Sequence, residues 1–236
     1  MTLPLSGLRV IELGQLIAGP FASKMLGEFG ADVIKIEPPE TGDPLRAWRM
    51  LHDGTSVWWA GHARNKRSIT LNLREPEGQD VIRQLAKDAD IVIENFRPGA
   101  LEKWGIGFKD LHAINPKLIM LRVSGYGQTG PYKDRPGFGV IGEAMGGWRA
   151  IVGDPDRPPA RMGVSIGDTL AATYGCMGAL AALHALLLAG LVYRALSLRT
   201  LWAVLVESTR SSAVITVIIA GAFVLSYAFT SEGVPQ

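Results

Sequence analysis

The residue best placed to do chemistry in this 236-residue chain is an aspartate beside a glycine, Asp168 in the sequence Ile166-Gly167-Asp168. An uncharged run over residues 169–193 follows it and is long enough for one helix. Near a helix N-terminus, free amides and the helix dipole stabilise a carboxylate charge. A carboxylate presented to an electrophilic carbonyl can act as a nucleophile. The same position suits a simple helix cap, and these residues alone leave both interpretations open.

Basic side chains near predicted strand ends offer a second kind of chemistry. Lys66 and Arg67 precede one predicted strand and Arg74 follows it, while Arg97 lies in a turn over residues 95–99 after another strand. A phosphate-bearing ligand needs such groups, because they donate charged hydrogen bonds to its oxygens. Ordinary solvated charge is the alternative interpretation for each of them.

Motifs for hydrolase, nucleotide and metal chemistry are absent from the sequence. It contains no G-x-S-x-G, no G-x-x-x-x-G-K-[ST] and no G-x-G-x-x-G after the first predicted strand. Neither a serine hydrolase nor a dinucleotide-binding enzyme is therefore indicated. No two histidines have the helical spacing of metal ligands, so we expect no metal site. The histidines are His52, His62, His112 and His184.

Composition narrows the class of protein further. A net charge of +2 does not indicate a nucleic-acid partner. The single cysteine, Cys176, excludes an intramolecular disulfide, and its apolar surroundings predict a buried structural thiol. The first residues lack the basic stretch and apolar core of a signal peptide. We therefore expect a protein of the reducing cytoplasm.

The elements that must position these residues alternate over the first 125 positions. Short apolar runs predict strands, and the segments between them have helical patterns. This alternation predicts an α/β fold with an open, doubly wound parallel (Rossmann-like) sheet, whose ligands bind at the carboxyl ends of the strands. The predicted strands are 8–13, 32–36, 68–73, 91–93 and 118–123, the predicted helices 19–29, 75–86, 98–104, 108–114 and 140–145, and the predicted ligand loops 15–20, 38–46, 95–99 and 124–136.

Charge is distributed unevenly along the chain, because 41 of the 46 charged residues lie in the first 168 positions. This break predicts an α/β domain over residues 1–186 and an apolar helical tail over residues 187–236. The run 169–193 suits either a buried core helix or a membrane span. The run 211–231 is long enough for a marginal span, so membrane contact through the tail is one expectation.

Five stretches together resemble the class III CoA transferase family, which includes formyl-CoA transferases and α-methylacyl-CoA racemases. They occur in the family's order and cover about residues 5–186, and their agreement makes the resemblance specific. The stretches are LSGLRVIELGQLIAGPFASKMLGEFGADVIKIEPPETGDPLR, NKRSITLNLREPEG, ADIVIENFRPGALEKWGIG, LRVSGYGQTGPYKDRPGF and IGDTLAATYGCMGALAALHAL.

The resemblance implies an acyl-CoA:carboxylate CoA transferase in which Asp168 attacks the thioester. An acyl-aspartyl anhydride would form, CoA thiolate would convert it to an aspartyl-CoA thioester, and an incoming acid would take the CoA. The substrates would be an acyl-CoA and a small carboxylic acid, with no tightly bound cofactor, and the family assembly would be a homodimer. By motif position, the CoA contacts would be Ile17, Ala18, Leu71, Asn72, Leu73, Arg74, Asn95, Phe96, Arg97, Lys103, Asp134, Arg135, Pro136, Gly137 and Phe138.

Two positions depart from the family pattern. Family racemases carry a His-Asp pair where this chain has Phe138 and Gly139. Because a phenyl ring cannot shuttle a proton, transfer is favoured over racemisation. Pro38 stands where some members have a CoA-contacting arginine.

The tail has a different resemblance. From about residue 187, the sequence YRALSLRTLWAVLVESTRSSAVITVIIAGAFVLSYAFTSEGVPQ resembles the large permease subunit of TRAP-type transporters. Family members are about twice as long as this chain, so the sequence resembles a fusion of a truncated CoA transferase with a permease fragment. The alternative to a transferase is a non-catalytic or membrane-anchored remnant that retains at most CoA binding.

Overall fold

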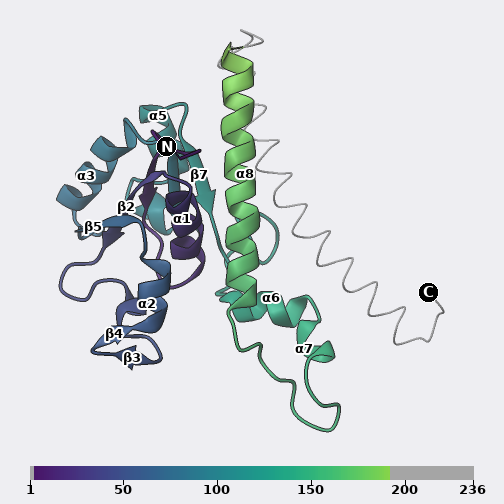
Figure 1. The fold of residues 1–236 in the computed structure, drawn as a ribbon. Helices are drawn as coiled ribbons and strands as arrows, with labels where there is room; N and C mark the ends of the chain where they lie inside the picture. The colour runs from purple at the N-terminus through teal and green to yellow at the C-terminus, as the bar shows by residue number, and fades with distance from the viewer. Residues whose placement is uncertain (1–2, 192–236) are drawn as a thin grey trace.

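A five-stranded parallel sheet forms the centre of the fold (Figure 1). The computed structural model describes residues 3–191. The strand order β5-β2-β1-β6-β7 is that of a doubly wound sheet, as predicted. The chain moves outward in one direction from β1 and then returns to its other side, so the topological switch point lies between β1 and β6. The strands are β1 (Arg9–Glu12), β2 (Asp32–Glu37), β5 (Lys66–Thr70), β6 (Ile91–Glu94) and β7 (Ile119–Arg122).

Helices cover both faces of this sheet, which explains why its central strands are continuous apolar runs rather than alternating ones. A small region of the 3₁₀ helix η1, the hairpin β3–β4 and α2 connects β2 to β5. The bounds are α1 (Ala18–Glu28), η1 (Pro44–Ala47), β3 (Leu51–His52), β4 (Thr55–Ser56), α2 (Val57–His62), α3 (Pro76–Ala86), α4 (Ala100–Lys103), α5 (Phe108–Ile114), α6 (Gly139–Met145), α7 (Trp148–Ile151) and α8 (Ile166–Leu191).

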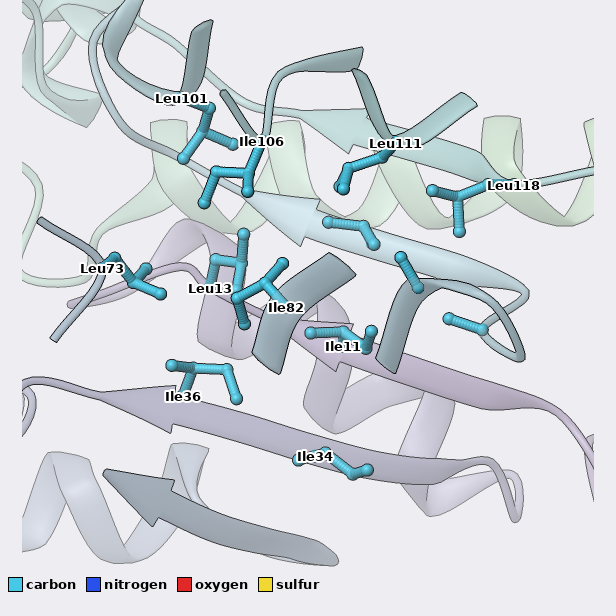
Figure 2. Close-up of a cluster of buried hydrophobic side chains, with 13 residues drawn as sticks. Ile11, Leu13, Ile34, Ile36, Leu73, Ile82, Leu101, Ile106, Leu111 and Leu118 are labelled. Atoms are coloured by element: carbon cyan, nitrogen blue, oxygen red, sulfur yellow. The ribbon is translucent and has the colours of Figure 1, made fainter. Parts of the chain in front are cut away.

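Each face of the sheet has its own apolar core. On one face, Ile11 of β1 packs with Ile82 of α3 and Leu111 of α5 (Figure 2). Val92 of β6 belongs to the same cluster. On the other face, Val10 and Ile93 pack against α1 and α8. The helix α8 contributes small side chains, Ala172, Cys176 and Ala179, which allow its backbone to approach closely.

The strand predicted over residues 68–73 differs from the structure at both ends. It is observed at Lys66–Thr70. It begins earlier because Lys66 and Arg67 have carboxylate partners in Glu12 and Asp32, which a pattern of apolar residues does not reveal. Leu73 lies beyond the strand and still joins the core, and this explains why the apolar pattern ran too far.

The long apolar run folds as one helix with two unlike sides. The inner side of α8 contacts α1, where the Cys176 thiol donates a hydrogen bond to Ala22 O at 3.2 Å. Burial raises the pKa of this thiol to about 12, which confirms the predicted structural cysteine. The outer side exposes Leu170, Tyr174 and Met177.

By length and composition alone, residues 166–188 of this helix could cross a membrane, and 17% of the most apolar window is buried in the fold. One side of the same helix packs on α1, and the two interpretations of the run, a buried core helix and a membrane span, both stay predictions. The predicted membrane run over 211–231, and most of the predicted tail, lie outside the described residues.

Candidate active site

The switch point of the sheet is closed by an asparagine. The side chain of Asn95, just after β6, accepts a hydrogen bond from Gln15 N and donates one to Gln15 O, both at 2.8 Å. Gly14 and Gly19 make room for this contact, because a Cβ on Gly14 would come within 3.0 Å of Asn95 Oδ1 and 2.9 Å of the Gly19 Cα. The predicted ligand residue Asn95 therefore ties together the turns that follow β1 and β6.

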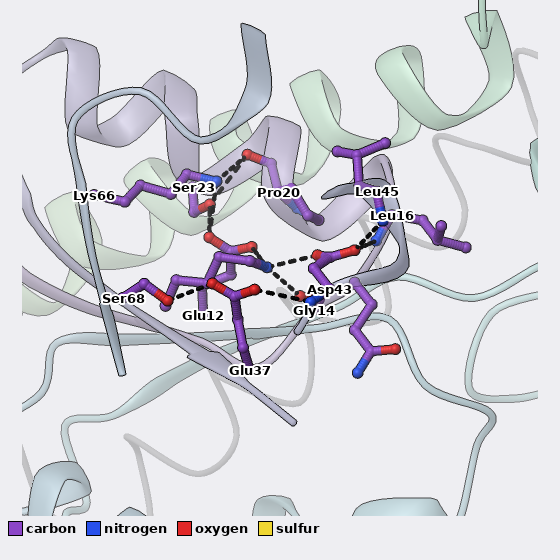
Figure 3. A network of polar contacts seen from close by, with 12 residues as sticks. Glu12, Gly14, Leu16, Pro20, Ser23, Glu37, Asp43, Leu45, Lys66 and Ser68 are labelled. Atoms are coloured by element: carbon purple, nitrogen blue, oxygen red, sulfur yellow. Dashed lines mark hydrogen bonds and ion pairs between the residues drawn. The ribbon is translucent and has the colours of Figure 1, made fainter. Parts of the chain in front are cut away.

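A buried network of charges lies beneath these turns (Figure 3). Glu12 in β1 is fully buried and forms ion pairs with Lys35 Nζ at 2.7 Å and with Lys66 Nζ at 2.8 Å. It also accepts a hydrogen bond from Ser23 Oγ at 2.6 Å. Burial alone would raise the pKa of Glu12, but the two lysines hold it below its ordinary value. Burial lowers the pKa of Lys66 to about 8 in spite of this pairing.

Asp43 connects the network to the turn before α1. Its carboxylate pairs with Lys35 at 2.8 Å and accepts amide hydrogen bonds from Leu16 at 3.0 Å and Leu45 at 2.9 Å. Leu16 has φ of 62°, a left-handed conformation that a leucine adopts only when its surroundings impose it. Asp43 thus fixes the turn that presents Ile17 and Ala18, two predicted CoA contacts at the start of α1.

A second carboxylate, Glu37, organises the end of β2. It accepts hydrogen bonds from Arg46 Nε at 2.7 Å, from Asp43 N at 2.8 Å and from Ser68 Oγ. Burial opposes ionisation, but the hydrogen bonds from Arg46 and Ser68 outweigh it and lower the pKa of Glu37 to about 2. A cavity of about 300 Å³ opens here, lined by Glu37, Pro38, Glu40, Thr41, Gly42, Arg46, Ser68 and Thr70.

The predicted nucleophile Asp168 lies in the first turn of α8. The helix begins at Ile166, so it includes Asp168, whereas the sequence placed the aspartate just before the helix. Figure 1 shows the short helix α6 beside this end of α8. The carboxylate lies directly against Gly139, the first residue of α6, and any Cβ at that position would overlap with Asp168 Oδ2. Glycine at 139 is thus a steric requirement for the carboxylate to occupy this place.

The pKa of Asp168 is set by its half-buried position and two charged neighbours. Burial raises it above the ordinary aspartate value, Arg161 opposes that rise, and the negative charge of Glu143 adds to it. The helix dipole of α8 favours the ionised form in its first turn. The result is a carboxylate that is less solvated than a surface aspartate and still faces a positive charge.

Glu143 is one helical turn beyond Gly139 on α6 and is 2% exposed. Its two oxygens each lie 3.8 Å from an arginine Nε, one of Arg149 and one of Arg161. Within the described part of the chain, neither oxygen accepts a hydrogen bond. A buried carboxylate without hydrogen bonds is costly, so this group indicates a site whose partners are incomplete.

Most of the predicted CoA contacts lie on the loops that follow the strands, while Ala18 begins α1 and Lys103 ends α4. Arg74, Arg97 and Lys103 are exposed, and within residues 3–191 none of them has an ion-pair partner. Phe96 is partly buried, where its amide donates to Glu94 Oε2 at 2.7 Å and its ring contacts Trp104. Ile17, Ala18 and Leu73 are buried, Leu71, Asn95 and Gly137 are half-buried, and Asn72, Asp134, Arg135, Pro136 and Phe138 are exposed.

Sequence reasoning missed the charged groups that hold this site. Lys66 was considered for phosphate binding, but it is buried against Glu12. Glu143 was not singled out, although it is the only charged residue between Arg135 and Arg149. A lone carboxylate in an apolar helix was the available signal for a buried functional group.

Comparison with known proteins defines the class to which this fold and site belong. Residues 5–190 match the model of CoA-transferase family III, and the chain belongs to this family. Residues 162–236 match the DctM component of the tripartite ATP-independent periplasmic transporters, as the tail resemblance predicted. The two matches overlap in the segment that contains Asp168 and α8.

The particular relatives are CoA-transferases. The chain is 61% identical over 182 residues to succinyl-CoA–D-citramalate CoA-transferase of Chloroflexus aurantiacus, covering 77% of this chain and 45% of the relative. It is 39% identical over 172 residues to human succinyl-CoA:glutarate CoA-transferase, covering 72% and 39% respectively. The chain thus spans about half the length of the curated relatives it matches.

Two solved structures agree with this relationship. The CAIB/BAIF family protein from Brucella suis superposes with a TM-score of 0.73 at 40% identity, over 78% of this chain and 50% of that chain. Rv3272 from Mycobacterium tuberculosis gives a TM-score of 0.72 at 33% identity, over 81% and 53%.

Proposed function

We propose that this chain forms the CoA-binding and nucleophile-bearing part of a transferase that moves CoA from succinyl-CoA to a small carboxylic acid. The observation that carries the proposal is the place of Asp168, half-buried against Gly139 at the carboxyl end of a parallel sheet. The names of the relatives support succinyl-CoA as the donor. Their named acceptors differ, citramalate in one and glutarate in the other, and a dicarboxylic acceptor is what they share.

The proposed reaction needs only the carboxylate and the thioester. A carboxylate oxygen of Asp168 attacks the acyl carbonyl, the C–S bond breaks, and CoA leaves as the thiolate with an acyl-aspartyl anhydride remaining. The thiolate then attacks the aspartyl carbonyl and releases succinate, which leaves an aspartyl-CoA thioester. The acceptor carboxylate attacks the aspartyl carbonyl of this thioester, the C–S bond breaks, and a second anhydride and CoA thiolate form. The thiolate then attacks the acceptor's acyl carbonyl, which gives the new acyl-CoA and releases the Asp168 carboxylate.

CoA itself would be held by the loops around the switch point. Arg74, Arg97 and Lys103 are the charged groups suited to its phosphates, because they are exposed and have no ion-pair partner in the described chain. The turn before α1, fixed by Asp43, would place backbone groups near Ile17 and Ala18 against the pantetheine. The remaining contacts would come from residues 71–74, 95–97 and 134–138.

Trapping with hydroxylamine tests this function. The full chain is incubated with succinyl-CoA and hydroxylamine, and the peptide that contains Asp168 is analysed by mass spectrometry. We expect an aspartyl hydroxamate at Asp168 in the wild type and none in Asp168→Asn. An unmodified peptide in the wild type, with CoA binding intact by calorimetry, would contradict the transferase and leave a CoA-binding module.

A second property is favoured by the match of residues 162–236 to a permease component. We infer that the tail, residues 211–231 above all, contacts a membrane while the transferase domain stays in the cytoplasm. Carbonate extraction of cell membranes tests this, since release of the full chain into the soluble fraction contradicts insertion.

Light scattering of the detergent-free protein tests the homodimer expected from the family resemblance.

A further inference from the structure

Glu143 on α6 lies near two arginines, Arg149 on α7 and Arg161 on the loop before α8, and both Glu143 and Arg161 act electrostatically on Asp168. We call Glu143 and the two arginines the arginine–glutamate cluster. Glu143 lies four residues after Gly139, so it is on the same face of α6, one turn of about 5.4 Å further along. Because Gly139 touches Asp168, Glu143 is about one helical turn along α6 from the residue that contacts the Asp168 carboxylate.

The cluster has unused hydrogen-bonding capacity. Both arginines approach Glu143 only through Nε at 3.8 Å, which is too long for a hydrogen bond. In the part of the chain that is described, the buried polar atoms without hydrogen-bond partners include both oxygens of Glu143 and Nε of Arg149. Guanidinium groups with free donors next to a reacting carboxylate are suited to bind a second carboxylate.

The charge balance of the site changes during the proposed reaction. With Asp168 ionised, its charge and that of Glu143 balance the two arginines. When Asp168 becomes an anhydride it loses its charge, and these four groups then carry one excess positive charge. A succinyl group brings one negative charge at its far end, about a helical turn from the bond to Asp168, whereas a butyryl group brings none.

We propose that Arg161 and Arg149, gathered by Glu143, recognise the distal carboxylate of a dicarboxylic acyl group once Asp168 carries that group. This inference rests on the proposed function and names the determinant of its acyl specificity. Arg161 is the more accessible of the two arginines, with 43% of its side chain exposed against 32% for Arg149. It is therefore the group that meets the ligand first.

An equilibrium binding experiment tests the recognition without turnover. Asp168→Asn in the full chain mimics the uncharged acylated state. Monomethyl succinate carries the neutral ester end and the distal carboxylate, and methyl butyrate replaces that carboxylate by a methyl group. By calorimetry we expect Asp168→Asn to bind monomethyl succinate more tightly than the wild type does, and more tightly than methyl butyrate. Adding Arg161→Gln should weaken the binding of monomethyl succinate roughly ten- to a hundredfold.

The matched control is Arg157→Gln in the same Asp168→Asn background. Arg157 is on the same loop, is 80% exposed and pairs with Asp154 rather than with Glu143. Its loss should leave the affinity unchanged. Equal affinity for the two esters, or no effect of Arg161→Gln beyond that of Arg157→Gln, would overturn the recognition. Failure of hydroxylamine trapping with preserved ester selectivity would instead contradict only the proposed transferase function.

Discussion

A carboxylate nucleophile must be ionised to attack and poorly solvated to attack well. Asp168, the proposed nucleophile, is half-buried in the first turn of a helix, where Arg161 lowers its pKa and Glu143 raises it. Burial makes the largest contribution and raises its pKa. The acid limb of the reaction should therefore lie above the ordinary aspartate value of 3.8.

Removing either charged neighbour should move this acid limb in a known direction. Glu143→Gln removes a negative charge that raises the pKa of Asp168, so the limb should shift to lower pH. Arg161→Gln removes a positive charge that lowers it, so the limb should shift to higher pH. The measurement is the rate of hydroxamate formation from succinyl-CoA between pH 4 and pH 8, in roughly half-unit steps. Shifts in the same direction would contradict this electrostatic assignment.

At this scale the sequence could single out Asp168 as a candidate nucleophile, but it could not identify the charged groups around it. A carboxylate between Gly167 and a long apolar run is visible in the amino-acid sequence itself. Glu143 meets arginines that are 6 and 18 positions further along the chain, and no local pattern announces such contacts. Lys66 was misleading for the same reason, because its partner Glu12 lies on a strand 54 positions earlier.

At the scale of elements, the contact between α6 and α8 fixes the position of Asp168, the proposed nucleophile. Gly139→Ala would place a methyl group on Asp168 Oδ2, so the carboxylate must move or the helices must separate. We expect the rate of hydroxamate formation to fall about a hundredfold, the usual consequence of a displacement near 1 Å.

The matched control for this change is Gly142→Ala on the same helix. The nearest atom to a Cβ at 142 is 3.9 Å away, so an alanine fits without movement. It should leave the rate unchanged and stabilise the protein by about 0.5–1 kcal/mol, since alanine favours a helix over glycine. Thermal unfolding checks the stability of both variants. Equal rates for the two would show that the contact with Asp168 is not needed.

The sequence predicted the central elements well because they obey one rule. Strands such as β1 and β6 are covered on both faces, so they appear as short apolar runs that periodicity detects. The hairpin β3–β4 and α2 were not predicted, since most of their residues are exposed and their placement depends on contacts such as that of Ser56 with Trp48 O at 2.8 Å. Asn95 was predicted as a ligand contact, and its tie to Gln15 could not be read from spacing.

At the scale of the molecule, buried carboxylates make the free energy of unfolding depend on pH. Glu37 has its side chain 1% exposed and its pKa lowered from 4.5 to about 2. Its folded-state pKa is depressed, so its stabilising contribution, about 3 kcal/mol, is fully present above pH 4.5 and is lost as the pH falls toward 2. The wild type should therefore lose more unfolding free energy between pH 7 and pH 3 than Glu37→Gln does.

Urea unfolding at the two pH values measures this difference. Glu40→Gln, a change at an exposed position on the neighbouring loop, is the control and should keep the pH dependence of the wild type. An equal loss in wild type and Glu37→Gln would show that the hydrogen bonds from Arg46 and Ser68 do not stabilise the charge.

The thiol sealed between α8 and α1 gives the chain a reporter of its own opening. The Cys176 thiol has a pKa of about 12 and donates a hydrogen bond to Ala22 O. It therefore does not react with an alkylating reagent while the two helices stay packed together. The rate at which an alkylating reagent labels Cys176 in native buffer therefore measures how often α8 separates from α1. The first turn of α8 moves with the rest of the helix. Since that turn contains Asp168, the same labelling rate would report how often Asp168, the proposed nucleophile, is displaced from its native position.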